Sequence, residues 1–513
     1  ESDIGALPVA GITAQTGRLR VLGVFGRENV LAAKTDNAPP INAVFGTRIC
    51  DLHVPVRPGG DIALSNALLK ALIARRAIDH ELVDRRTTGW SDVVRRLDTE
   101  ELDDLIGATG VDAATFEQLV EMYAGAGSAV LIWSMGITQH TFGVEAVRGI
   151  VNVGLARGNV GRNGAGLMPI RGHSGVQGGA EMGAYATALP GGINITAESA
   201  AALSAEWGFT VPDHDGLTAT EMVEAAGRGE LDVIWMSGTN FLEVLPDPAA
   251  VAAALGSVPT RIHQDVVVTS QMLLEGNDVI LLPVTTRYEQ EGGGTSTTTE
   301  RRIAFSPEIP RQVGEARSEW RLFGDVVARA RPDLAEHFAW PNNQALRSEI
   351  AQIVPAYAGL EFLERTGDAV QWGGRHLCAG GRFPLPDGKA RFSVVEPPSN
   401  DIPDGKFLLS TRRGKQFNSI VWAEVDPLTG ATRDAAYLDR ADAHALGLAD
   451  GDRVVLRSDV GEMAARVRLS RLPPRTVQVH WPEANVLLPA GASHREPGSR
   501  IPDYQAFVEI VPA

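Results

Sequence analysis

Residues 132–183 read IWSMGITQHTFGVEAVRGIVNVGLARGNVGRNGAGLMPIRGHSGVQGGAEMG. An apolar run of strand length lies at the beginning of this stretch, and apolar residues at helical spacing follow over 144–154. Glycine-rich loops surround the helix, and the last of them carries Arg171, His173 and Gln177 where a core segment would carry leucine. Glycines allow backbone N–H groups to approach an anion closely. The stretch therefore predicts a strand, a glycine turn and a helix that lay backbone and polar side chains against a large anionic ligand.

The alternation of strand and helix continues further along the chain. Apolar, strand-like runs at 232–236, 261–264 and 279–282 are interrupted by a helix at 248–254. Such alternation predicts a mostly parallel sheet of the doubly wound kind. In these sheets ligands bind beyond the carboxyl ends of the strands. The loop SGTN at 237–240 is therefore expected to form the same kind of crevice as the glycine turn SMGITQ at 134–139.

The flanking segments predict helices before this region and strands after it. Residues 61–80 have the spacing of an amphipathic helix capped by Asp61, and a second helix is expected at 115–123. From residue 405 onward, strand-like runs alternate with Gly–Asp turns such as the one at 450–452. Periodicity alone predicts a β-rich domain there.

Composition excludes several classes of protein. Lysine and arginine total 47 against 63 acidic residues, a net charge of −16, which disfavours nucleic-acid binding because basic groups must neutralise phosphates. No run of about 18 consecutive apolar residues occurs, so we expect no membrane-spanning helix and, by default, a cytoplasmic protein. Cys50 and Cys378 are the only thiols, so these residues build neither a zinc site nor an iron–sulfur cluster. We expect Cys50 to be a buried structural residue.

Longer motifs occur in a characteristic order. The loops SMGITQ, ARGNVGRNGAG and PIRGHSGVQGGAEMG are followed by SGTNFLEVLPD, RIHQD, NDVILLP, YEQEGGGTSTTTERR, LLSTRRGKQFNS and VQVHWPEANVL. These motifs and their order resemble the molybdopterin oxidoreductases of the dimethyl-sulfoxide-reductase superfamily. Within it, the formate dehydrogenase alpha-subunit branch is the most similar. The resemblance covers most of residues 45–513.

The resemblance implies a multidomain α/β fold with doubly wound, mostly parallel sheets and a carboxyl-terminal six-stranded β-barrel. Residues 1–172 are assigned to an α/β dinucleotide-binding domain that is incomplete at its amino terminus, and residues 173–305 to a second such domain. Residues 306–400 are expected to form a connecting segment. Residues 401–513 correspond to the barrel, which in the family closes over a molybdopterin dinucleotide.

The resemblance also implies a cofactor, since the family binds molybdenum or tungsten through two molybdopterin guanine dinucleotides. A carboxylate such as that of Asp265 can accept the paired N–H donors of a guanine edge. Three groups of loops are implied to hold the cofactor. Their residues are Met135, Gly136, Gln139, Gly172 and Gln177; Gly238, Asn240, His263, Gln264 and Asp265; and Ser410, Thr411, Arg412, Asn418 and Asn485.

Arg171 falls where the formate-oxidising members keep an arginine beside the metal. A guanidinium holds a carboxylate through two parallel hydrogen bonds, so the resemblance implies formate or a similar small molecule as substrate. His173 or His140 could take the released proton, since imidazole titrates near neutral pH. A phosphate-binding arginine and hydrogen-bonded structural histidines are the alternative interpretations.

The metal ligand of the family precedes the first pterin loop by a long stretch of sequence, and only 134 residues precede Met135 here. We therefore expect no metal-ligating residue in this chain. An iron–sulfur cluster would have to come from missing sequence or from a partner, and a partner protein would accept the electrons. Two further hypotheses stay open: an oxo-transfer reductase of the same superfamily, and a non-catalytic scaffold subunit of an electron-transfer complex.

Overall fold

The computed structural model divides the protein into two compact units. One unit combines Glu1–Leu167 with Cys378–Ala513, and the other comprises Met168–Leu377. Each unit has hydrophobic cores of its own. The described residues are 22–23, 50–170, 175–276, 278–399, 401–414, 423–426 and 429–513.

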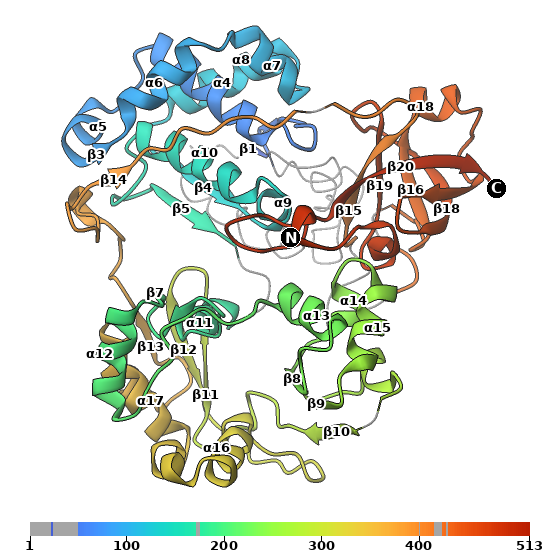
Figure 1. Ribbon diagram of the computed structural model, residues 1–513. Helices are drawn as coiled ribbons and strands as arrows, with labels where there is room; N and C mark the ends of the chain where they lie inside the picture. Colours follow the sequence, from blue (N-terminus) through green and yellow to red (C-terminus); the bar gives the residue numbers. More distant parts are fainter. Residues whose placement is uncertain are drawn as a thin grey trace, which may run out of the picture. The chain divides into compact units, whose positions relative to one another are not determined.

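Helices dominate the first part of the first unit (Figure 1). Their apolar faces share one core that includes Leu69, Leu119 and Leu155. The helix predicted at 61–80 begins at Asp61 but ends at Ala74, and its N-cap is Gly60, so the predicted capping role of Asp61 is wrong. The helices are α4 (Asp61–Ala74), α5 (His80–Arg86), α6 (Trp90–Asp98), α7 (Leu102–Thr109), α8 (Ala113–Gly125) and α10 (Gly143–Ala156).

A strand and a tight turn precede α10. β4 (Val130–Trp133) pairs with β5 (Gly166–Pro169) and leads into α9 (Met135–Thr138), a short helix where the sequence predicted a glycine turn. A Cβ atom on Gly143 would lie 2.3 Å from the carbonyl oxygen of Thr138, so only glycine lets α10 begin so close to α9. The turn places the predicted binding loop at the carboxyl end of β4.

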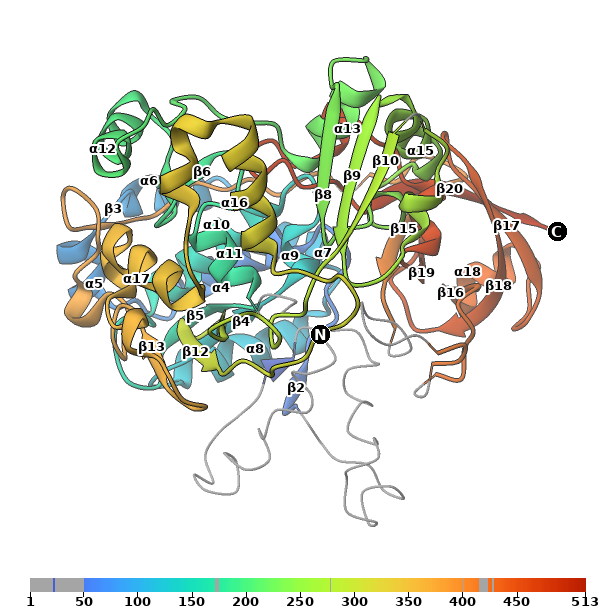
Figure 2. The same cartoon turned by 90° about the horizontal axis from the view of Figure 1, so that it is seen from below.

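The second unit contains a parallel sheet (Figure 2). Its strands are β8 (Val233–Ser237), β9 (Thr260–Asp265) and β10 (Asp278–Pro283), in the order β10-β9-β8. Ile234 and Met236 share a core with Leu255 of α15 (Pro248–Ser257), while on the other face Trp235 packs against Phe323 of α16 (Glu319–Ala330). The predicted parallel, doubly wound arrangement is confirmed for these strands.

The rest of this unit surrounds an antiparallel sheet. Its strands are β11 (Gly294–Thr297), β12 (Arg302–Ser306) and β13 (Ala369–Gln371). Ile303 and Phe305 on β12 pack with Tyr357 and Leu360 in a separate core. The elements around it are α11 (Val176–Glu181), β6 (Ala188–Leu189), β7 (Ile193–Asn194), α12 (Ala197–Trp207) and α17 (Asn343–Ile353), whereas α13 (Ala219–Gly227) and α14 (Phe241–Val244) pack with α15 in the core of the parallel sheet.

The carboxyl-terminal part of the first unit is a closed six-stranded barrel, as predicted. Alternate residues point inward, so Leu409, Leu438, Leu456 and Val477 are completely buried in its core. No helix in the described part of the chain combines the length and apolarity that a membrane crossing needs. The strands, in spatial order, are β15 (Phe407–Arg412), β19 (Thr476–His480), β16 (Ala435–Asp439), β18 (Glu462–Ser470), β17 (Arg453–Arg457) and β20 (Gln505–Pro512).

Candidate cofactor site

The first predicted loop lies on α9, directly after β4. A Cβ atom added to Gly136 would meet nothing within 4 Å, so packing inside the protein does not require glycine there. An absent side chain at an open position leaves room for a ligand to approach the backbone. Met135, Gly136 and Gln139 are therefore brought together at the carboxyl end of a strand, as the sequence predicted.

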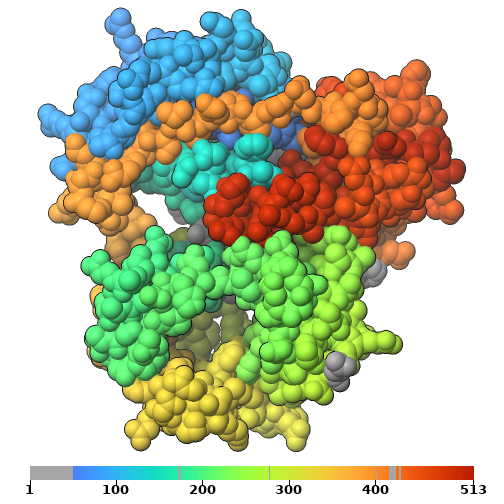
Figure 3. Space-filling view, viewed as in Figure 1, coloured from blue at the N-terminus to red at the C-terminus, as the bar shows by residue number. Residues whose placement is uncertain are grey.

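The barrel contacts this loop from within the same unit. The backbone N–H of Tyr504 donates to the carbonyl oxygen of Gln139 (3.3 Å), and the hydroxyl of Thr141 donates to Asp503. Arg413, just after β15, places its Nη2 3.9 Å from the sulfur of Met135. Figure 3 shows the dark red segment before β20 packed on the cyan surface of this region. The first loop and the barrel thus form one continuous surface.

Basic side chains gather at the end of the barrel that meets the loop. Arg412 lies over the ring of Tyr437 and pairs with the fully buried Asp426 at 3.4 Å. Arg433 donates to Glu483 and to the carbonyl oxygen of Arg413 (2.7 Å). The sequence predicted Arg412 but not its neighbour or Arg433, although the tandem arginines in STRRGKQ were a signal for the former.

His480 lies within this basic group and is completely buried. Burial, followed by the charges of Arg412 and Arg433, lowers its pKa to about 4. Nδ1 faces the carbonyl oxygen of Arg433 (3.2 Å), so this nitrogen carries the proton of the neutral ring. Asn485 lies nearby in sequence on a short 3-10 helix and is 2% exposed. Arg412, Arg413 and Arg433 meet two carboxylates here, Asp426 and Glu483, so the group has an excess of one basic side chain.

Ser410 and Thr411 lie on β15 together with Arg412, and all three are partly exposed. Three of the five predicted residues of the third group therefore lie on one strand.

His140 lies behind the first loop and is 6% exposed. Its Nδ1 accepts the backbone N–H of Phe142 (3.2 Å), so the ring proton is on Nε2, which has no acceptor among the described residues. Burial raises the pKa of Asp61, which lies close to His140. The backbone of its own loop holds the ring in place, so His140 is suited to positioning that loop.

In the second unit, Gly238 and Asn240 follow the carboxyl end of β8. Gly238 has a positive φ of 64°, and a Cβ atom there would meet nothing within 4 Å. The side-chain Nδ2 of Asn240 donates to the hydroxyl of Ser270 (3.0 Å). The predicted second crevice therefore has the same open backbone as the first.

His263, Gln264 and Asp265 are consecutive on β9, so neighbouring side chains point to opposite faces of the sheet. His263 is 1% exposed, and burial, with a smaller effect from Arg261, lowers its pKa. Gln264 accepts from the indole of Trp235 at 3.1 Å. Only Asp265, at the strand end, is partly exposed. These three residues do not converge on one point, because the strand turns neighbouring side chains to opposite faces.

Gln177 lies on α11, where its Nε2 donates to Glu181 (2.6 Å). Two neighbouring glycines differ in their surroundings. A Cβ atom on Gly178 would lie 2.6 Å from Oγ1 of Thr297, whereas one on Gly179 would meet nothing within 4 Å. One side of α11 is therefore packed, and the other is open.

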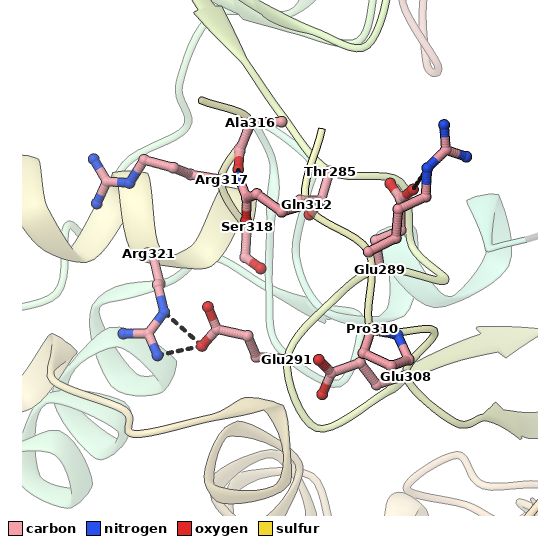
Figure 4. Close-up of a pocket in the computed structure, with 11 residues that line it drawn as sticks. Thr285, Glu289, Glu291, Glu308, Pro310, Gln312, Ala316, Arg317, Ser318 and Arg321 are labelled. Atoms are coloured by element: carbon pink, nitrogen blue, oxygen red, sulfur yellow. Dashed lines mark hydrogen bonds and ion pairs between the residues drawn. The ribbon is translucent and has the colours of Figure 1, made fainter. Parts of the chain in front are cut away.

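A pocket of about 440 Å³ lies beyond the carboxyl end of β10 (Figure 4). Thr285 lines it and is 9% exposed, and its Oγ1 has no hydrogen-bond partner among the residues described. Glu291 pairs with Arg321, and Glu289 lies 3.9 Å from Arg311. Because these charges neutralise one another, the pocket suits a polar group of low net charge. The sequence did not predict it, and its position after a strand was the only signal.

Four predicted residues, Arg171, Gly172, His173 and Asn418, lie outside the described residues. No group of three or more His, Cys, Asp or Glu side chains in the described ranges could hold a metal ion. Cys50 is half-buried rather than fully buried, and like Cys378 it forms no disulfide. The open glycines and the basic end of the barrel nevertheless fit a large anionic ligand that approaches the backbone closely.

Family comparisons agree with this geometry. The family model "Molybdopterin oxidoreductase" matches residues 33–329, and the model "Molydopterin dinucleotide binding domain" matches residues 407–508. The site and fold thus define a pterin-dependent oxidoreductase, and the chain belongs to the molybdopterin oxidoreductase family. The matched domains assign it the bis-molybdopterin guanine dinucleotide cofactor with its metal, as predicted.

The relatives are longer than this chain, which matches about two thirds of their length. An uncharacterised oxidoreductase of Mycobacterium tuberculosis is 27% identical over 98% of this chain and 69% of its own length. The F420-dependent formate dehydrogenase subunit alpha of Methanocaldococcus jannaschii is 26% identical over 85% of this chain and 66% of its own. The structure of acetylene hydratase from Pelobacter acetylenicus aligns with a TM-score of 0.65 at 15% identity, covering 91% of this chain and 72% of that one. The last comparison supports the fold alone.

Proposed function

We propose that the protein oxidises formate to carbon dioxide, releasing one proton and two electrons. The motif PIRGHSGVQGGAEMG carries this proposal, because its Arg171 supplies a guanidinium that can grip a carboxylate. Similarity to a formate dehydrogenase alpha subunit over 85% of the chain supports the same substrate. When bound, the metal and its sulfur ligands accept the electron pair of the formate C–H bond.

The chain's own residues orient the substrate and receive the proton. Arg171 holds both carboxylate oxygens of formate, which directs the C–H bond toward the cofactor. We assign the proton acceptor to His173. His140 is less suited, because its Nδ1 lone pair already accepts the N–H of Phe142 and its other nitrogen carries the ring proton. His140 instead holds the pterin loop in position.

Replacement of Arg171 tests the proposal. Arg171→Ala should lower kcat/KM for formate at least a thousandfold while molybdenum or tungsten and pterin per chain stay unchanged. Arg171→Lys keeps the charge but loses the two-point grip, so an intermediate loss with a raised KM is expected. Formate turnover that survives in the alanine variant would overturn the role of Arg171, and a loaded, unmodified protein that does not turn over formate would overturn the substrate assignment.

Two other functions make different predictions. An oxo-transfer reductase would keep metal and pterin but turn over oxidised substrates and not formate. A scaffold subunit would carry neither metal nor pterin. The open positions at Gly136 and Gly238 favour a cofactor-loaded enzyme, since a scaffold has no need of uncovered backbone. Counting metal and pterin per chain separates the scaffold from the two enzymes, and an assay of formate turnover separates the two enzymes from each other. An electron-accepting partner protein and a cytoplasmic location belong to the same proposal.

A further inference from the structure

Glu181, at the end of α11, receives three hydrogen bonds from uncharged groups. Its Oε1 accepts the side-chain N–H of Gln177 at 2.6 Å. Its Oε2 accepts the indole N–H of Trp372 at 3.1 Å and the hydroxyl of Tyr357. Within the described part of the chain, Glu181 forms no ion pair. The carboxylate is therefore stabilised by donors that converge on it from three separate elements.

The identity of these donors fixes the orientation of one amide. An ionised carboxylate accepts hydrogen bonds and cannot donate them. The amide of Gln177 must therefore turn its NH₂ group toward Glu181, which leaves its carbonyl oxygen, Oε1, on the other side of the amide. In the described structure no donor binds that oxygen. Gln177 is partly exposed, and its neighbour Gly179 leaves open space where a side chain would be.

The anchor for this orientation is rigid. Tyr357 is 4% exposed, and burial together with its hydrogen bond to Glu181 raises its pKa. The hydroxyl of Thr297 lies 3.5 Å from that of Tyr357, and the same threonine packs where a side chain on Gly178 would lie. α11 is thus locked against β11, so Glu181 cannot move away from Gln177 without breaking several contacts.

We propose that Glu181 is a positioning residue that makes Gln177 an obligate hydrogen-bond acceptor toward an N–H group of a pterin ring. The rim of a pterin presents N–H donors beside acceptor atoms, and an acceptor oxygen on Gln177 can pair only with the donors. This inference rests on the proposed contact between Gln177 and the cofactor. It adds that Gln177 accepts and does not donate the hydrogen bond in this contact, and that Glu181 fixes this direction.

Exchanging the two side chains tests the proposal. In Glu181→Gln the amide of Gln177 is free to turn, and pterin release should accelerate about fivefold, the factor expected for one hydrogen bond of about 1 kcal/mol. In Gln177→Glu two carboxylates meet, so release should be faster still and the melting temperature lower. The double variant Gln177→Glu with Glu181→Gln restores an acceptor at 177 and a donor at 181. Its release rate should return to within about twofold of the unmodified protein.

The readouts are the half-time of pterin release, followed by fluorescence of the oxidised pterin, and the melting temperature of the cofactor-free protein. Tyr357→Phe is the matched control, because it removes a donor from Glu181 without touching Gln177. It should lower the melting temperature and leave pterin release unchanged.

Three outcomes would overturn the inference: equal release from Glu181→Gln and the unmodified protein, a double variant no better than Gln177→Glu, or accelerated release in Tyr357→Phe equal to that in Glu181→Gln. Absence of pterin from the unmodified protein is a different result, because it would remove the proposed function itself.

Discussion

His480 shows how neighbouring charges set the state of one side chain. Its pKa is about 4 in the folded protein, below the ordinary value of 6.5, because burial and two arginines disfavour the imidazolium. As the pH falls below 6.5, His480 becomes protonated in the unfolded chain but stays neutral in the folded protein. The stabilisation is therefore complete above pH 6.5 and is lost between pH 6.5 and 4, and it amounts to about 3 kcal/mol.

We therefore expect the free energy of unfolding to fall by about 3 kcal/mol more between pH 7 and 4 in the unmodified protein than in His480→Gln. Urea titrations of the cofactor-free protein, followed by tryptophan fluorescence, measure the difference. The matched control is His444→Gln on the exposed surface of α18 (Arg440–Ala445). Parallel pH curves for His480→Gln and the unmodified protein would contradict the assignment.

His263 leads to a second prediction at this scale. Neither ring nitrogen has a hydrogen-bond partner among the described residues, and the side chain is 1% exposed. Leaving such a group unsatisfied costs about 1–3 kcal/mol. His263→Leu should therefore raise the free energy of unfolding of the cofactor-free protein by about 1 kcal/mol and leave pterin content unchanged. A loss of pterin with an intact fold would instead support the cofactor contact that the sequence predicted.

The predictable residues are those whose role follows from their place along the chain. Met135 and Gly238 follow apolar strands, so the sequence could place them at strand ends. The roles of His263 and Gln264 were harder to judge, because a predicted strand gives alternate faces but does not show which side chains become buried. Arg433 was out of reach, since only the closed barrel brings it to the backbone of Arg413.

At the scale of the element, α11 presents two adjacent glycines in opposite surroundings. Gly178→Ala would push a methyl group against Thr297 of β11, a separation of 2.6 Å, and should destabilise the protein by about 1–3 kcal/mol. Gly179→Ala points into open space, and alanine favours a helix over glycine by about 1 kcal/mol, so the cofactor-free protein should be as stable or more stable.

The same two variants should differ in pterin release as well, and here Gly179→Ala should have the larger effect. Gly179→Ala should accelerate release because its methyl group occupies space on the open side of α11, while Gly178→Ala should act mainly on the melting temperature. Thermal melts of the cofactor-free protein and release half-times of the loaded protein measure both effects. If Gly179→Ala retains pterin normally, the open side of α11 does not face the cofactor.

Elements with strong periodicity were predicted from the sequence, and their ends were not. The strands of the parallel sheet and of the barrel follow apolar runs bounded by turn residues, so their positions were foreseeable. The helix at 61–80 is shorter than predicted, since it ends at Ala74 and Arg76 has a left-handed φ of 55°. Closure of the barrel came from the resemblance, because periodicity specifies strands but not which strands pair.

At the scale of the whole molecule, the chemistry of the thiols limits how electrons can leave. The chain has two cysteines, Cys50 and Cys378, and both are half-buried. A cluster needs four ligands, and the described residues contain no group of three or more ligating side chains. We therefore expect molybdenum or tungsten with less than about 0.1 iron atom and no acid-labile sulfide per chain of these 513 residues. Elemental analysis and a sulfide assay measure both quantities.

Formate oxidation by this chain should then depend on a small dye that reaches the metal directly, and an added iron–sulfur partner protein should increase the rate of electron transfer to larger acceptors. The control is Cys50→Ser with Cys378→Ser, which should leave metal content and dye-linked activity unchanged. Stoichiometric iron that disappears in this double variant would show that the two thiols do bind a cluster, and the electrons would then leave through the chain itself.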